Sequence, residues 1–111
     1  MHKIMLKLDE AAAGLEALGN PSRLEIYRLL VRAGDSGKPV GAIQEATGIV
    51  ASTLSHHLKL LQLAGLITRR KEGTTHYCCA SYEAMDSLIA FLPEECCAEA
   101  EPHPDAPHTA K

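Results

Sequence analysis

The stretch that decides the fold is Thr47–Ala80, which reads TGIVASTLSHHLKLLQLAGLITRRKEGTTHYCCA. When Ala51–Ala64 is placed on a helix at about 100° per residue, apolar residues and one glycine form a narrow seam. These seam positions are Leu54, Leu58, Leu61 and Gly65. The opposite side carries small hydroxyls, an imidazole and one cation, and no acidic residue: Ser52, Ser55, His56 and Lys59. Such a face suits a groove of DNA, because hydroxyls and imidazole reach base edges while lysine neutralises phosphate. A polar helix face that only meets solvent is the commoner case, so the flanking segments matter.

The flanking segments favour DNA binding. Val40–Thr47 reads as a short helix that Gly48 ends, which gives a helix-turn-helix arrangement. Downstream, Leu66–Arg70 and Thr74–Ala80 read as two strands around a turn at Lys71-Glu72-Gly73. A basic hairpin in this place is typical of a wing that grips the DNA backbone. We therefore expect the DNA-binding residues to be Ser52, Thr53, Ser55, His56, Lys59, Arg69, Arg70, Lys71 and Thr74.

Four motifs occur in a fixed order along the chain. They are LGNPSRL at 18–24, ASTLSHHLKLL at 51–61, AGLI at 64–67 and RKEG at 70–73. Together they resemble the arsenic-repressor (ArsR/SmtB) family of winged helix-turn-helix repressors. The resemblance implies a mainly α fold with a small β-hairpin wing and about five helices. It also implies a symmetric homodimer, joined through its first and last helices, that binds double-stranded operator DNA with an inverted repeat.

The remaining elements follow from periodicity and breaker residues. Helices are expected over 3–18, 22–33, 39–47 and 81–93, with a loop over 34–38 and N-caps at Asn20 and Ser81. The residues expected to face the core of the second and third helices are Leu24, Ile26, Tyr27, Leu30, Val31, Val40, Ile43 and Ala46. The last helix carries an apolar stripe of Met85, Leu88, Ile89 and Leu92. Residues 1–97 are expected to form one domain, and 98–111 a disordered tail rich in prolines and acids.

Composition narrows the class of protein. A chain of 111 residues with few aromatic residues and no Trp predicts one helix-rich domain with an aliphatic core. No apolar run approaches the ~18 residues of a membrane span, and no secretion signal is read, so a cytoplasmic location without membrane contact is expected. The net charge of −3 is uneven, because Glu94–Lys111 holds five acidic residues against one lysine. Met1–Pro93 is therefore +1 (−3 minus −4), and its positive charge lies where the predicted groove-binding helix and wing are, which matters more for DNA binding than the total.

The adjacent cysteines Cys96 and Cys97 are the predicted metal site. Two neighbouring thiols directly after the last helix can chelate one soft ion. Some members of the resembled family carry a Cys-Cys pair here and sense arsenite, which implies As(III) or Sb(III) as the inducer. As(III) prefers about three thiolates, and the third ligand is open between Cys78, Cys79, solvent hydroxide and an added small thiol. Two incidental thiols are the alternative.

Other metal sites are less favoured. His103 and His108 could complete a zinc set with the cysteine pair, although zinc is the less favoured ion. The position of the resembled family's Cys-Val-Cys segment, at 42–46, has no cysteine, and the last helix has Glu83 and Asp86 but no histidine. Cys78 and Cys79 point to opposite sides of a strand, which predicts one core residue and one exposed thiol.

The predicted function is a metalloid-responsive repressor that releases operator DNA when As(III) or Sb(III) binds its thiolates. A thiol redox or persulfide switch of the same fold is the first alternative, and a regulator without a ligand is the second. No Ser/His/Asp set, phosphate-binding glycine loop or HExxH motif is read, so no enzyme is expected.

Overall fold

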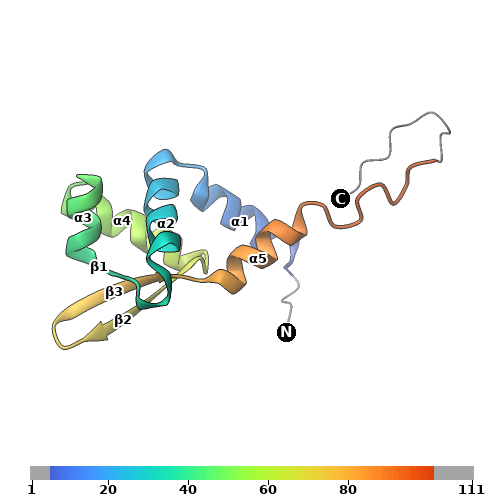
Figure 1. Ribbon diagram of the computed structural model, residues 1–111. Helices are drawn as coiled ribbons and strands as arrows, with labels where there is room; N and C mark the ends of the chain where they lie inside the picture. Colours follow the sequence, from blue (N-terminus) through green and yellow to red (C-terminus); the bar gives the residue numbers. More distant parts are fainter. Residues whose placement is uncertain (1–5, 102–111) are drawn as a thin grey trace.

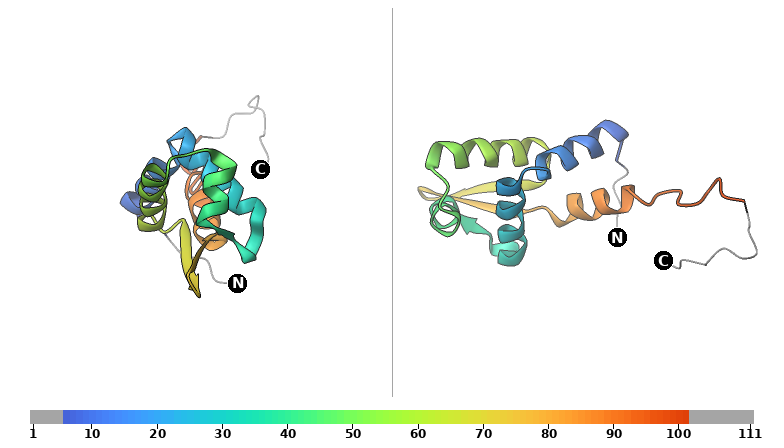
Figure 2. Two further views of the ribbon diagram at one scale, coloured as in Figure 1. Left: turned by 90° about the vertical axis from the view of Figure 1, so that its left-hand side faces the viewer. Right: turned by 90° about the horizontal axis from the view of Figure 1, so that it is seen from above.

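The computed structural model describes residues 6–101 and confirms the winged helix-turn-helix class. Its elements run in the following order: α1 (Leu8–Leu18), α2 (Pro21–Ala33), the 3-10 helix η1 (Gly34–Ser36), β1 (Lys38–Pro39), α3 (Val40–Thr47), α4 (Ala51–Leu63), β2 (Ile67–Glu72), β3 (Thr75–Ala80) and α5 (Tyr82–Phe91). Helix α2 occupies the middle (Figure 1). Helices α3 and α4 and the hairpin lie toward one end of the molecule, and α5 and the segment after it lead to the other (Figures 1 and 2). No helix within residues 6–101 is both long and apolar enough to span a bilayer.

The helix ends follow their capping residues. The Asn20 side chain accepts a hydrogen bond from the backbone N–H of Arg23 at 3.1 Å, and Pro21 occupies the first position of α2. The Ser81 hydroxyl accepts from the N–H of Ala84 at 3.2 Å. Gly48 ends α3 in the left-handed conformation, with φ of 72°. The three predictions for these residues are confirmed.

Two predicted helices are too long. The first helix begins at Leu8 instead of Lys3, because Lys7 is its extended N-cap residue and its N–H donates to the Glu10 carboxylate at 2.9 Å. Residues 3–5 of that prediction lie outside the described residues. The last helix ends at Phe91 instead of Pro93. Proline has no N–H with which to continue the helical hydrogen bonds.

The sheet has three strands where two were predicted. Its order is β1-β3-β2, because Lys38 pairs with Cys78 and Pro39 with Tyr77. A two-residue strand leaves no alternating pattern in the sequence, which is why 34–38 was wrongly predicted as a loop and Pro39 as helical. Gly37 permits the approach, since a Cβ there would lie 2.5 Å from the carbonyl oxygen of Cys78.

The hairpin turn lies further along the chain than predicted. Strand β2 continues to Glu72, which pairs with Thr75, and the turn consists of Gly73 and Thr74. Gly73 has a φ of 64°, which suits the two-residue turns that join twisted strands. The shift places Lys71 within the strand, so that its side chain has a defined face of the sheet.

The leucine seam of α4 forms the centre of the core. Leu54, Leu58 and Leu61 are fully buried, as predicted. They belong to one cluster with the large buried side chains of the other elements: Ile26, Leu30, Ile43, Leu66, Ile67 and Cys78.

Three residues predicted to face the core do not. Leu24 is 43% exposed, because it lies about 200° around α2 from Ile26, on the uncovered side. Ala46 is exposed because the short helix α3 fully buries only Ile43. Gly65 is exposed because α4 ends at Leu63, and its φ of 79° takes the chain toward β2.

Replacing Leu58 by Ala tests the seam. Removal of a fully buried leucine side chain is expected to lower the free energy of unfolding by about 2–5 kcal/mol, because it leaves a cavity. Leu63→Ala is the matched control, since Leu63 is on the same helix and 73% exposed; its effect should stay near 0.5 kcal/mol. Urea denaturation at one protein concentration measures both. Equal losses would show that the seam is not the centre of stability.

Candidate nucleic-acid interface and cysteine pair

The turn between α3 and α4 is held by its own backbone and by one side chain. The Thr47 hydroxyl donates to the Ile43 carbonyl at 2.8 Å and accepts from the N–H of Ile49 at 3.3 Å. No side chain caps α4, so the first N–H groups of this helix have no side-chain partner. These groups form the positive end of the helix dipole, which favours an anion such as a DNA phosphate.

The polar face of α4 is open to solvent. All five of its predicted DNA-binding residues are exposed: Ser52, Thr53, Ser55, His56 and Lys59. The seam residues behind them are buried, so the helix cannot turn this face inward without losing the core. Helix α4 has no acidic residue. This is the arrangement that a helix entering the major groove needs, and contact with DNA remains a prediction for each residue.

The wing does not bring its three cations to one face. Successive strand residues alternate between faces, so Arg69 and Lys71 share one face and Arg70 lies on the other. The register pairs Arg69 with Cys78 and Arg70 with Tyr77. Arg69 is half-buried, whereas Arg70, Lys71 and the turn residue Thr74 are exposed.

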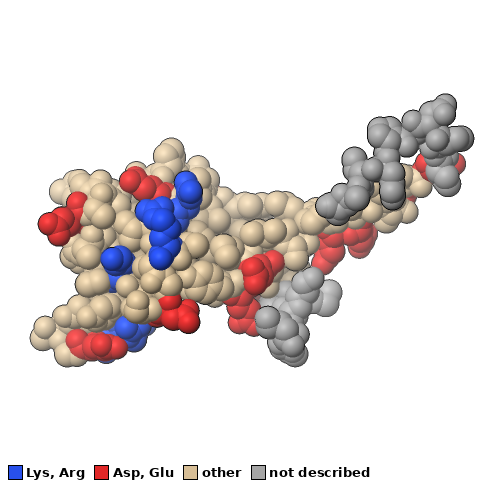
Figure 3. Space-filling model, viewed as in Figure 1, with Lys and Arg blue, Asp and Glu red and all other residues tan. Residues whose placement is uncertain are grey.

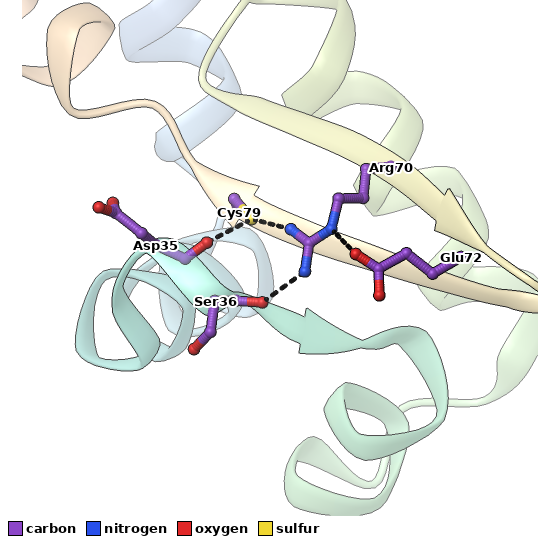
Figure 4. Close-up of polar contacts among 5 residues, drawn as sticks. All are labelled: Asp35, Ser36, Arg70, Glu72 and Cys79. Atoms are coloured by element: carbon purple, nitrogen blue, oxygen red, sulfur yellow. Dashed lines mark hydrogen bonds and ion pairs between the residues drawn. The ribbon is translucent and has the colours of Figure 1, made fainter.

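Arg70 is bonded within the chain (Figure 4). Its Nε donates to the Glu72 carboxylate at 2.6 Å, and its Nη2 donates to the Ser36 carbonyl at 3.2 Å. Its Nη1 lies 3.5 Å from the Cys79 sulfur, and its guanidinium carbon lies 4.8 Å from the centre of the Tyr77 ring. The hydrogen bond with Glu72 raises the pKa of Arg70. Because its charge is already paired, Arg70 has less to gain from a phosphate than Lys71.

Two residues beside this surface were missed by the sequence analysis. Val50 is the N-cap residue of α4 and is 68% exposed, in the place where an apolar side chain can meet a thymine methyl group. Its position between a turn glycine and the helix was a usable signal. His76 and Arg69 line a hollow of about 420 Å³ beside the first residues of α3. Only the register reveals His76, which pairs with Lys71.

The cysteine pair lies in the segment after α5, which leads away from the wing (Figures 1 and 2). Cys96 and Cys97 are both exposed, and their sulfurs are 3.5 Å apart. The backbone of Cys97 is in the left-handed conformation, with φ of 63°. The hydrogen bond with the Cys97 thiol raises the pKa of Cys96.

No third ligand joins the pair within the described part of the chain. Residues 6–101 contain no group of three or more His, Cys, Asp or Glu side chains that could hold an ion. Cys78 is buried in the core and Cys79 is half-buried, which confirms their predicted division except that Cys79 is less exposed than expected. His103 and His108 lie outside the described residues.

Charge is unevenly distributed along the molecule. On the face shown in Figure 3, several clusters of acidic side chains lie over α5 and the segment after it. Lys and Arg side chains on the same face lie over the half that contains α2 and the wing, although acidic residues occur there too. On this face the basic side chains therefore lie in the half that also carries the predicted DNA-binding elements.

Alanine substitutions on the wing test its two faces. Lys71→Ala is expected to weaken DNA binding on all sequences and to lower the slope of log K against log salt by about 1 per contact, and by about 2 in a dimer. Arg70→Ala is the matched control on the neighbouring position and should change the slope less, because Arg70 is paired with Glu72. Fluorescence anisotropy with a salt series measures both. An unchanged slope for Lys71→Ala would remove this face of the wing from the interface.

Comparison with known proteins agrees with this geometry. A family model described as a helix-turn-helix domain matches residues 18–70. An uncharacterized HTH-type transcriptional regulator of Methanocaldococcus jannaschii is 33% identical over 90 residues, which cover 81% of this chain and 99% of that protein. A protein of Halobacterium salinarum named "Putative arsenical resistance operon repressor ArsR2" is 41% identical over 78 residues, which cover 70% of this chain and 61% of that protein.

A solved structure extends the similarity to the whole fold. The homodimeric winged helix-turn-helix DNA-binding domain Mb0332 from Mycobacterium bovis, described as "a possible ArsR-family transcriptional regulator", superimposes with a TM-score of 0.64. It is 32% identical, and the match covers 86% of this chain and 89% of that domain. The order of helices, the turn before α4 and the wing after it are thus shared with a DNA-binding domain. The chain belongs to the ArsR family of winged helix-turn-helix transcriptional regulators.

Proposed function

We propose that the protein is a metalloid-responsive repressor that binds operator DNA as a homodimer and releases it when As(III) or Sb(III) binds Cys96 and Cys97. The observation that carries this proposal is the pair of exposed thiols whose sulfurs lie 3.5 Å apart directly after α5. The similarity to the protein named "Putative arsenical resistance operon repressor ArsR2" supports the same class of ligand.

The pair suits one soft ion. The two sulfurs already lie 3.5 Å apart, close enough for both to bind a single soft ion with little movement. Only thiolates bind such an ion, and the hydrogen bond with Cys97 raises the pKa of Cys96. When arsenite binds, each arsenic–sulfur bond replaces an arsenic–hydroxyl bond, and the hydroxide leaves as water with the proton of the thiol, so that no net proton is released.

The third ligand comes from outside the described chain segment or from solution. Cys78 is a poor candidate because it is fully buried, and burial raises the pKa of its thiol. The Cys79 sulfur is in contact with Arg70 and with the carbonyl of Asp35, each at 3.5 Å. A solvent hydroxide or a small added thiol fits the exposed pair better.

A homodimer explains the exposed apolar residues of α1 and of the end of α5. Leu8 is 74% exposed and Leu15 42%, and Ile89 and Leu92 are 61% and 65% exposed. Helices α1 and α5 contact each other, and α1 contacts α4. A change at α5 can therefore reach α4, which is the recognition helix of the proposed DNA complex. A bound ion would order the segment after α5 and change the separation of the two recognition helices, which must match grooves about 34 Å apart. A tenfold or greater change in DNA affinity is a typical coupling of this kind.

The close thiols also support an alternative. Two sulfurs at this separation can oxidise or take up additional sulfur, which would make the pair a redox or persulfide sensor. Mass spectrometry of the reduced protein, treated with arsenite and separately with peroxide or a persulfide, separates the possibilities. A stoichiometric arsenic adduct supports the metalloid sensor, and a disulfide or polysulfide without arsenic binding supports the redox sensor. A protein that forms neither is a regulator without a ligand at these thiols.

Serine substitutions test the sensing site. Cys96→Ser and Cys97→Ser should bind operator DNA like the wild type, because both residues are exposed and outside the core, yet should remain bound when arsenite is added. Cys79→Ser is the matched control and should still release DNA. Anisotropy titrations of DNA with and without arsenite provide the measurement. If Cys96→Ser and Cys97→Ser left the DNA at the same arsenite concentration as the wild type, the sensing site would lie elsewhere.

A further inference from the structure

One guanidinium joins the helices α1, α2 and α4. The Nε of Arg23, in the first turn of α2, donates to the carbonyl of Ala17 in α1 at 2.7 Å. Its Nη1 lies 3.2 Å from the Nδ1 of His57 in α4. The backbone N–H of Arg23 is itself fixed by the Asn20 cap at 3.1 Å. Arg23 therefore holds α1, α2 and α4 at one point.

His57 is the acceptor in this contact. A guanidinium has only donors, so Nδ1 must be unprotonated and the ring must carry its proton on Nε2. The residue is 9% exposed, and it is the one buried polar side chain of α4. A protonated ring would place an N–H against an N–H and a second cation beside Arg23.

We propose that Arg23 and His57 form a positioning pair that fixes the rotation and axial position of the recognition helix relative to α1. The proposal rests on the DNA binding of the family and on dimer formation through α1, and not on the metalloid. The leucine seam alone does not define this placement, because apolar burial has no directional preference. A hydrogen bond between a charged donor and a ring nitrogen does, since it weakens steeply with misalignment.

The consequence concerns the DNA-reading side chains. Ser55 and His56 directly precede His57 and are exposed, so any rotation of the helix at His57 moves both across the groove. In a dimer, the same rotation changes the separation of the two recognition helices. Loss of the pair should therefore weaken binding and also relax the preference for one spacing between half-sites.

The pair also predicts a dependence on pH. Burial lowers the pKa of His57, with smaller contributions from Arg23 and from the neighbouring ring of His56. Glu16 of α1 lines the same hollow as Arg23, but Arg70–Glu72 is the only ion pair within residues 6–101. A lowered pKa means that the native arrangement is fully favoured above the ordinary value near 6.5 and is lost as the pH falls below it.

The experiment compares His57→Gln with His57→Leu. Gln retains an acceptor but does not titrate, whereas Leu fills the buried space and removes the acceptor. A high-affinity DNA is first selected from a random library with the wild type, without arsenite. At pH 7.5 we expect His57→Gln to bind within about threefold of the wild type and His57→Leu to bind about tenfold more weakly. Arg23→Lys, which keeps the charge but not the two-acceptor fork, should resemble His57→Leu.

Two further measurements separate positioning from folding. Between pH 7.5 and 5.5 the wild type should lose more affinity, relative to its own value at pH 7.5, than His57→Gln. One base pair inserted between the half-sites should penalise the wild type more than His57→Leu. Thermal unfolding checks that each variant is folded, and 15N NMR of the wild-type imidazole reports the Nε2–H tautomer without DNA. The proposal would be overturned if His57→Leu had the same DNA affinity, spacing preference and pH profile as the wild type. It would also be overturned if the wild-type imidazole carried its proton on Nδ1.

Discussion

Burial of one leucine seam is the constraint on which the rest of the structure depends. Leu54, Leu58 and Leu61 have no solvent exposure, and helices α1 and α2 and strand β2 all contact α4. Each fully buried leucine contributes about 1.5–3 kcal/mol relative to an exposed one. Because the seam is fixed inward, the hydroxyls and the imidazole on the opposite side are fixed outward. The orientation of the polar face of α4 therefore depends on the same three residues that hold the domain together.

Hydrogen bonds fix the orientations of helices and strands that burial of apolar side chains does not define. Arg23 connects α4 to α1 through His57, and Arg70 connects the wing to η1 and to Glu72. Both arginines use separate guanidinium nitrogens for separate acceptors, which is the geometry that lysine cannot supply. The two arginines thus hold in place the two elements that carry the predicted DNA-binding residues. Under the proposal made above, a basic residue affects DNA binding by positioning α4 and need not contact phosphate.

The cysteine pair lies in the segment after α5, which leads away from the end of the molecule that holds α3, the start of α4 and the wing (Figures 1 and 2). We therefore do not propose that an ion bound at Cys96 and Cys97 competes directly with DNA. A ligand shifts such an equilibrium only if it prefers one arrangement of the dimer. The contacts of α1 with both α4 and α5 make α1 the physical connection between the two ends.

The sequence by itself determined the local features. Periodicity located the seam, capping rules located Asn20, Gly48 and Ser81, and adjacency alone brought Cys96 beside Cys97, because each of these depends on residues within a few positions of one another. The tertiary structure decided the rest. The pairing of β1 with β3, the hydrogen bond of Arg70 with Ser36 and the contact between Arg23 and His57 join residues that are 34 or more positions apart. Their approach depends on how the helices and strands pack around the buried leucines, and no local pattern in the chain records that packing.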